Sequence, residues 1–446
     1  MSILKTGFGR ADITPPKYHG LAGFGGDFRR VCNYIIDRPL LTCVALVDET
    51  GNKSLIYSSD TLYVHEQMVA MVREAVCDEL GVPAANVLMV ATHTHAGPSV
   101  YAGEENITAY YPTYLKAAVQ AARDALEDLA PTQIAVGSKL VPNMTFVRHY
   151  VLDDGTFIGM GFGHPGRTRF HTDIPDDQLQ LIRFTRENAR DILLVNWQCH
   201  ATSPSGETQK DMCSAFVGPL RNHLEGLSGC KVIYLQGACG NLVPSSRIEE
   251  ENIIPVGDYV AHGRKMAEEA FSLLPELEAV SSGKLYSRQE IYSLAVDHSD
   301  DHLADLAAQT YDEYYRLTDP AERRQLIKDR GFNSVYHAMH VRKRRNMPES
   351  CEMELNALCA GDIAFATVPY EMFNSNGRFV KENSPFPMTF MLAYCNGFHS
   401  YLPDDKAFNY DCYEVNARCY ARGSAEEVAQ RNVALLKHIK EEQKNG

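Results

Sequence analysis

Five strongly apolar segments of this chain each end abruptly in a cluster of polar residues. The segments, each with the cluster that follows it, are 86–91 before Thr92–Pro98, 192–197 before Gln198–Ala201, 231–235 before Gln236–Asn241, 362–368 before Pro369–Glu371, and 388–394 before Cys395–Tyr401. Short apolar runs of this kind are typical of strands that are buried on both faces, as in an α/β sheet. In such sheets, ligands bind beyond the carboxyl ends of the strands. We therefore expect one shared site, assembled from segments that lie far apart in the sequence.

Amphipathic stretches alternate with these apolar runs, which predicts an α/β fold with a mixed or mostly parallel sheet flanked by helices. We expect strands at 55–59, 87–91, 192–197, 231–236, 363–368 and 388–394, and helices at 64–77, 112–129, 217–224, 260–274 and 426–442. The stretch 297–345 is rich in charge and poor in strand signals, which favours two surface helices. We expect residues 1–446 to form a single catalytic unit in which 297–345 is a helical insertion.

The composition excludes several classes of protein. Acidic residues outnumber basic ones by 57 to 43, for a net charge of −14, which argues against a nucleic-acid binder. No apolar run is long enough to span a membrane, and the N-terminal segment lacks the apolar core of a secretion signal. We therefore expect a cytoplasmic protein that acts on a small molecule and whose twelve cysteines are reduced. The sequence does not indicate an oligomeric state.

The cluster Thr92–Pro98 contains two histidines, His93 and His95, that lie two positions apart. In an extended chain both side chains face the same way, so both could bind one metal ion, or one could bind it while the other acts beside it. The alternative is a pair of histidines that hydrogen-bond within a turn. The Gly-Pro pair that follows ends the strand and holds both residues at its tip.

His200 and Glu371 follow two of the other apolar runs directly. A single histidine in such a place is more often a core residue whose hydrogen bonds are satisfied. A buried carboxylate needs a partner, either an arginine or a metal ion, because an unpaired buried charge is very costly. Zinc accepts imidazole nitrogen and carboxylate oxygen, commonly from three protein ligands. The wide spacing of these residues does not form a local motif, so both interpretations stay open.

Together these segments resemble the neutral/alkaline non-lysosomal ceramidase family. The matching segments are Gly9–Pro15, Ala91–Pro98, Asn196-Trp197 with His200, Gln236 with Gly240–Pro244, Pro369–Glu371, and Asn396–Tyr401 followed by Tyr413-Glu414. The Thr-His-Thr-His-x-Gly-Pro match is specific, and the others are strong jointly. The segments also occur in the family's order.

The resemblance implies a zinc-dependent hydrolase that cleaves the amide bond of ceramide. It implies that the Zn²⁺ ligands are His93, His200, Glu371 and Tyr401. By the same resemblance, His95 is the second active-site histidine and acts as general base and acid, and Arg148 lies near the developing oxyanion.

The chain departs from the family at one position that bears on the chemistry. Val243 stands where ceramide-cleaving members have a serine implicated in catalysis, and Asn241 stands where they have an aspartate. The chain also ends where the family's C-terminal immunoglobulin-like domain would begin. We therefore expect a divergent, compact, bacterial-type relative that uses metal-activated water on an amide other than ceramide.

Two alternatives stay open at this point. One is a zinc-dependent ester or lactone hydrolase that acts on a small polar substrate with the same site. The other is a metal-binding protein whose site has lost or changed its catalytic function. The complete set of histidines and the glutamate argues against loss of the site, whereas Val243 argues for a change of chemistry.

Overall fold

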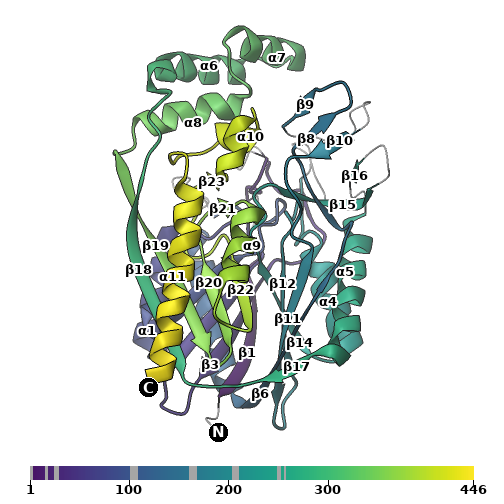
Figure 1. The fold of residues 1–446 in the computed structure, drawn as a ribbon, viewed down its shortest axis with the longest axis vertical. Coiled ribbons are helices and arrows are strands. Elements are labelled where there is room, and N and C mark those ends of the chain that lie inside the picture. The colour runs from purple at the N-terminus through teal and green to yellow at the C-terminus, as the bar shows by residue number, and fades with distance from the viewer. Residues whose placement is uncertain are drawn as a thin grey trace.

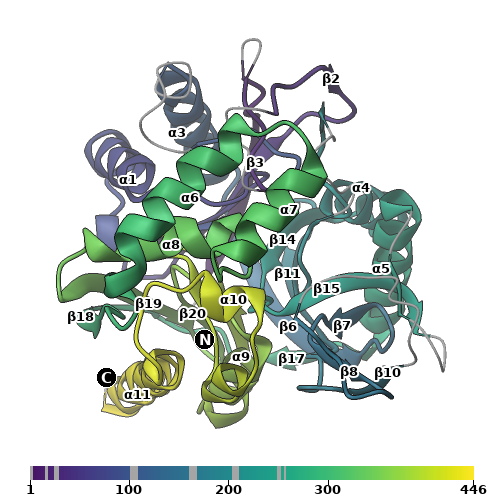
Figure 2. The same ribbon diagram turned by 90° about the horizontal axis from the view of Figure 1, so that it is seen from above.

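Two β-sheets packed face to face form the centre of the molecule, and helices cover their outer faces (Figures 1 and 2). The computed structural model describes residues 4–15, 19–24, 30–100, 109–159, 168–202, 210–248, 253–255 and 258–445. This mixed α/β architecture with flanking helices is the one predicted from the alternating sequence pattern.

Within the described residues, the larger sheet has nine strands and is antiparallel in its middle and parallel at both ends. Its path runs β14 (Lys231–Gln236), β12 (Ile192–Trp197), β11 (Gln178–Arg186), β6 (Ala130–Leu140), β1 (Lys5–Asp12), β3 (Leu40–Val47), β4 (Lys53–Ser59) and β5 (Val87–Ala91), with β17 (Glu278–Val280) beside β6. The parallel pairs are β12 with β14 and β4 with β5.

The second sheet contains β18 (Leu285–Ala295), β19 (Ser350–Ala360), β20 (Ile363–Thr367) and β22 (Met388–Leu392), in that order, and β20 and β22 are parallel. The core between the two sheets consists of buried side chains from both, such as Ile56 and Leu194 from the larger sheet and Phe365 and Phe390 from the smaller. Each such side chain contributes about 1.5–3 kcal/mol when it is fully buried. The apolar runs of the sequence therefore form strands that line this core.

The flanking helices are α1 (Glu66–Leu80), α3 (Tyr111–Glu127), α4 (Val217–Ser228), α5 (Tyr259–Leu273), α9 (Asn374–Asn383) and α11 (Ser424–Asn445). Two glycines allow α3 to lie very close to β1. A Cβ atom on Gly7 would come within 2.0 Å of the carbonyl oxygen of Ala125, and one on Gly9 within 2.0 Å of that of Ala121. These positions therefore accept only glycine, because any side chain would push the helix off the sheet.

The segment 297–345 contains three helices, α6 (Ala304–Arg316), α7 (Pro320–Asp329) and α8 (Val335–Arg345), preceded by the 3₁₀ turn Asp301–Leu303. The prediction of two helices is wrong because two separate caps start new helices. The side chain of Asp319 accepts a hydrogen bond from the amide of Ala321 at 2.7 Å, and that of Ser334 accepts one from the amide of His337 at 3.1 Å. The helices share a small core of their own.

Short elements complete the fold. They are β2 (Tyr34–Ile35), β7 (Thr145–Val147), β8 (Tyr150–Leu152), β9 (Phe157–Ile158), β10 (Thr168–His171), β13 (Asp211–Met212), β15 (Leu242–Ile248), β16 (Ile253–Pro255), β21 (Glu371–Met372), β23 (Tyr401–Leu402), α10 (Tyr413–Asn416), and 3₁₀ turns at Ala84–Asn86, Leu274–Glu276 and Asp405–Asn409. Among the described helices, none is long and apolar enough to cross a bilayer. All twelve cysteines have free thiols, and most of them are buried.

Candidate metal centre

The carboxyl ends of strands from both sheets meet at one end of the molecule. The amide of Ala91, at the end of β5, donates to the carbonyl of Tyr394, just beyond β22, at 3.2 Å. The amide of Ala393 donates to the carbonyl of Gln236, the last residue of β14, at 3.1 Å. These bonds join segments from both sheets, so the polar residues that follow the apolar runs come together.

His93 follows β5 in a left-handed backbone conformation, with φ of 59°. Its Nδ1 is 2.8 Å from the carbonyl oxygen of Leu62. Because a carbonyl oxygen only accepts, Nδ1 must bear a proton, and Nε2 has a free lone pair whenever the ring is neutral. That Nε2 atom lies 3.3 Å from Oε2 of Glu371. The ring also stacks on Tyr394, with the two centroids 3.9 Å apart.

His200, which follows β12, repeats this arrangement. Its Nδ1 lies 2.7 Å from the carbonyl oxygen of Cys239 and 2.9 Å from that of Leu242. Its Nε2 lies 3.2 Å from the same Oε2 atom of Glu371. The residue is fully buried, and burial lowers the pKa of His200 to about 4.

Glu371 is buried in β21, which pairs with β23 so that Glu371 lies beside Tyr401. Burial by itself raises the pKa of Glu371, but positive charge and hydrogen-bond donation from His93 and His200, in their protonated forms, outweigh it and hold the pKa well below its usual range. When both rings are neutral and carry their proton on Nδ1, two imidazole lone pairs face one carboxylate oxygen. These atoms repel one another unless a cation lies between them. The donor set of two imidazole nitrogens and one carboxylate oxygen fits zinc.

His95 differs from the other two histidines. Its Nε2 lies 3.3 Å from Nε2 of His93, and the three histidines offer nitrogen atoms within 4.8 Å of one another. Its Nδ1 is buried and has no hydrogen-bond partner among the described residues. Metal-binding histidines almost always donate their second ring N–H to a carbonyl or carboxylate, as His93 and His200 do and His95 does not. This difference favours a role for His95 beside a cation rather than as its ligand.

Arg148 and Tyr401 border the same centre. Nη2 of Arg148 donates to the hydroxyl of Tyr401 at 3.3 Å and to the carbonyl of Gly240 at 3.1 Å, and the guanidinium also pairs with Glu414. Burial opposes the charge on Arg148, but the Glu414 carboxylate outweighs this effect and raises the pKa of Arg148. The arginine is therefore a fixed cation next to Tyr401.

Glu414 belongs to a second buried cluster, with His149 and Cys412, that the residue patterns did not assign to the site. Its carboxylate pairs with Arg148 through one oxygen and accepts from Nε2 of His149 at 2.6 Å through the other. Burial raises the pKa of the Cys412 thiol far above its usual value, so the thiolate form is disfavoured. The cluster is an ion-pair network that positions Arg148. The one sequence signal for this cluster was Tyr413-Glu414, which is among the segments that resemble the ceramidase family.

Val243, at the position where the resemblance implied a serine, lies in an apolar environment. It is 3% exposed and packs with Phe146, Tyr150, Leu152 and Ile158. Its backbone carbonyl accepts a hydrogen bond from the hydroxyl of Thr145 at 3.1 Å. The side chain at this position therefore contributes packing and has no nucleophilic atom.

Backbone strain concentrates around the centre. Besides His93, the non-glycine residues with positive φ include Tyr394 at 53°, Asn396 at 62° and Ser400 at 72°, all in the segment that leads from β22 to β23. Such conformations cost on the order of 1–3 kcal/mol each and persist where the surrounding structure enforces them. They mark the segment as one whose side-chain positions are held by tertiary contacts.

No protein-family model and no curated protein sequence matches this chain significantly. Two solved structures are similar over almost its whole length. A neutral ceramidase from Pseudomonas aeruginosa is 17% identical with a TM-score of 0.74, and the match covers 99% of this chain and 75% of that one. A ceramidase complexed with C2 is 17% identical with a TM-score of 0.72, covering 99% and 76%. The chain thus has a ceramidase-like fold.

Proposed function

We propose that this protein is a zinc-dependent hydrolase that cleaves the amide bond of a small molecule other than ceramide. In this proposal, residues 1–446 form one catalytic unit. One observation carries it: Nε2 of His93 and Nε2 of His200 both face Oε2 of Glu371, while both Nδ1 atoms are bound to backbone carbonyls. We assign these three residues as zinc ligands and Tyr401 as the fourth.

A zinc ion held by this set supplies Lewis acidity, which polarises a carbonyl group and makes water a stronger nucleophile near neutral pH. In hydrolysis the water oxygen bonds to the carbonyl carbon and the C–N bond breaks. His95 takes one proton from the water and delivers it to the departing amine nitrogen, which makes it both general base and general acid. This role fits its unpaired Nδ1 atom and its partial exposure.

Arg148 stabilises the negative charge that develops on the carbonyl oxygen. Its charge is fixed by Glu414, and one of its N–H groups already orients the hydroxyl of Tyr401. Preorganised donors of this kind stabilise the transition state strongly, because they need no reorganisation during the reaction.

The metal assignment predicts the zinc content of purified protein. After purification with zinc present and removal of the excess, mass spectrometry should find close to one zinc per chain in the wild type and little in His93→Ala and Glu371→Gln. His438→Ala is the matched control, because this side chain is 61% exposed on α11. Full zinc content in either site variant, or none in the wild type, would exclude the assignment.

A second prediction concerns Val243. Because zinc chemistry does not require a serine nucleophile, Val243→Ser should not raise turnover of the true amide substrate. The substitution should lower stability by about 1–3 kcal/mol, since it buries a hydroxyl among apolar side chains. Turnover of ceramide and of a panel of small amides should be measured for both proteins. Ceramide turnover by the wild type at about 1 per second or faster would contradict the assignment of a substrate other than ceramide.

A further inference from the structure

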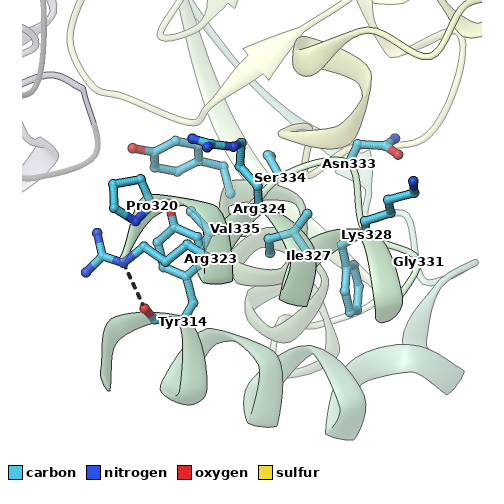
Figure 3. Close-up of a pocket in the computed structure, with 12 residues that line it drawn as sticks. Tyr314, Pro320, Arg323, Arg324, Ile327, Lys328, Gly331, Asn333, Ser334 and Val335 are labelled. Atoms are coloured by element: carbon cyan, nitrogen blue, oxygen red, sulfur yellow. Dashed lines mark hydrogen bonds between the residues drawn. The ribbon is translucent and has the colours of Figure 1, made fainter. Parts of the chain in front are cut away.

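The helical insertion contains a pocket of about 630 Å³ between α7, α6 and the start of α8 (Figure 3). Ligand pockets in proteins commonly enclose about 300–1,000 Å³. The lining includes the aromatic side chains of Tyr314, Phe332 and Tyr336, together with the polar side chains of Asn333 and Ser334. The pocket is large enough for the end group of a small molecule.

The pocket is cationic although the chain as a whole has a net charge of −14. Among the described residues, its lining includes Arg323, Arg324 and Lys328 and no acidic side chain. Nε of Arg323 donates to the carbonyls of Tyr314 at 3.2 Å and Leu317 at 2.9 Å, so this guanidinium is held in place at the rim.

Three acidic residues of α7 and its neighbours have partners outside the pocket lining. Asp319 caps the helix, Asp329 accepts from the side-chain amide of Gln325 at 2.7 Å, and Glu313 pairs with Arg330 at 3.0 Å. These carboxylates stay charged, but among the described residues none of them lines the pocket, so the lining itself carries only positive charge.

Tyr336 connects this pocket to the metal centre. It lines the pocket, its hydroxyl donates to the carbonyl of Phe24 at 2.9 Å, and its ring lies 5.9 Å from that of Tyr413. The ring of Phe24 is 4.9 Å from that of His95, and the ring of Tyr413 is 5.5 Å from that of Tyr401. Tyr336 thus borders the pocket and also lies next to residues that contact His95 and Tyr401, and both views of the fold place the segment 297–345 at that end of the molecule (Figures 1 and 2).

We infer that this pocket binds an anionic group, a carboxylate or a phosphate, on the substrate of the metal centre. The substrate class is then an amide whose portion remote from the scissile bond is negatively charged, such as an N-acyl amino acid. This inference rests on the proposed hydrolase function. It also explains how a protein with a net negative charge can bind an anionic substrate, because the three cations provide a local region of opposite charge.

Binding of matched probes to the full chain tests the inference without turnover. The probes share one acyl chain and differ in the end group: an N-acylglycine, an N-acyl phosphoethanolamine and a neutral N-acylethanolamine. Titration calorimetry on protein that contains His95→Ala should show tighter binding of the anionic probes. Adding Arg324→Gln and Lys328→Gln should weaken that binding about 10-fold or more, increasingly so at low salt, and leave the neutral probe unaffected.

The control is the pair Lys116→Gln and Lys437→Gln, which removes the same charge from exposed positions on α3 and α11. This pair should leave binding of every probe unchanged. Equal loss of binding in the control and pocket variants, or no loss in either, would overturn the inference. A further outcome is that anion binding depends on Arg324 and Lys328 while the wild type hydrolyses no amide. That result would support the pocket as an anion site and refute the hydrolase proposal. The anionic probe that binds more tightly identifies the group as carboxylate or phosphate.

Discussion

Replacing His95 with alanine is expected to lower kcat/KM for the true amide substrate by roughly 10²–10⁴-fold, the usual contribution of a general acid–base residue. Zinc content should stay at the wild-type level, because His95 lacks the carbonyl partner that orients the Nε2 atoms of His93 and His200. Steady-state kinetics and metal analysis on the same preparation measure both quantities.

Glu371→Gln provides the comparison for that experiment. This variant keeps the size of the side chain but removes the charge that both Nε2 atoms face, so activity and zinc content should fall together. Loss of zinc in His95→Ala would show that His95 is a ligand. Retained activity in His95→Ala would remove it from the proposed mechanism.

Replacing Glu414 with glutamine is expected to lower the free energy of unfolding at pH 7 by about 3–5 kcal/mol, because it leaves the Arg148 guanidinium buried without its carboxylate. Urea unfolding measures this loss. The matched control is Glu79→Gln, which breaks an ion pair with Arg123 whose side chains are 42% and 50% exposed. Exposed pairs contribute about 0–1 kcal/mol, so the control should change little.

The effect of Glu414→Gln should also depend on pH. Burial raises the pKa of Glu414, but Arg148 and His149 outweigh it and lower the pKa from 4.5 to about 2. A carboxyl group with a depressed pKa in the folded state stabilises the protein fully above its unfolded pKa and loses that contribution as pH falls towards the folded pKa. The difference between wild type and variant should therefore shrink between pH 4.5 and pH 2. A difference that is constant over this range would contradict the ion-pair explanation.

The apolar runs were enough to predict the strands that meet at the metal centre. β12 and β14 have the predicted bounds, and β20 and β22 end within two residues of them. These strands are buried on both faces, so a short continuous apolar run indicates them. Strands such as β18 were missed because one face is exposed and its sequence, LYSRQEIYSLA, contains too many polar residues to form a run.

The pairing of the strands was not predictable in the same way. Sequence spacing did not indicate that two sheets pack face to face, or that antiparallel strands form the middle of the larger one. Partner choice depends on contacts between segments that lie far apart in the chain. The third helix of the segment 297–345 was missed for a local reason, since the caps at Asp319 and Ser334 were not recognised.

By itself, the sequence determined that polar side chains such as His93, His200 and Glu371 follow buried strands, and it predicted that they gather beyond the carboxyl ends of those strands. The reason is local, because a run of apolar residues and the turn that ends it are properties of adjacent positions. Only the tertiary structure decided which atoms face one another. The Nε2 atoms point at Glu371 because the Nδ1 atoms meet carbonyls of other segments, and Arg148 is a fixed cation because Glu414, 266 residues away, is its partner.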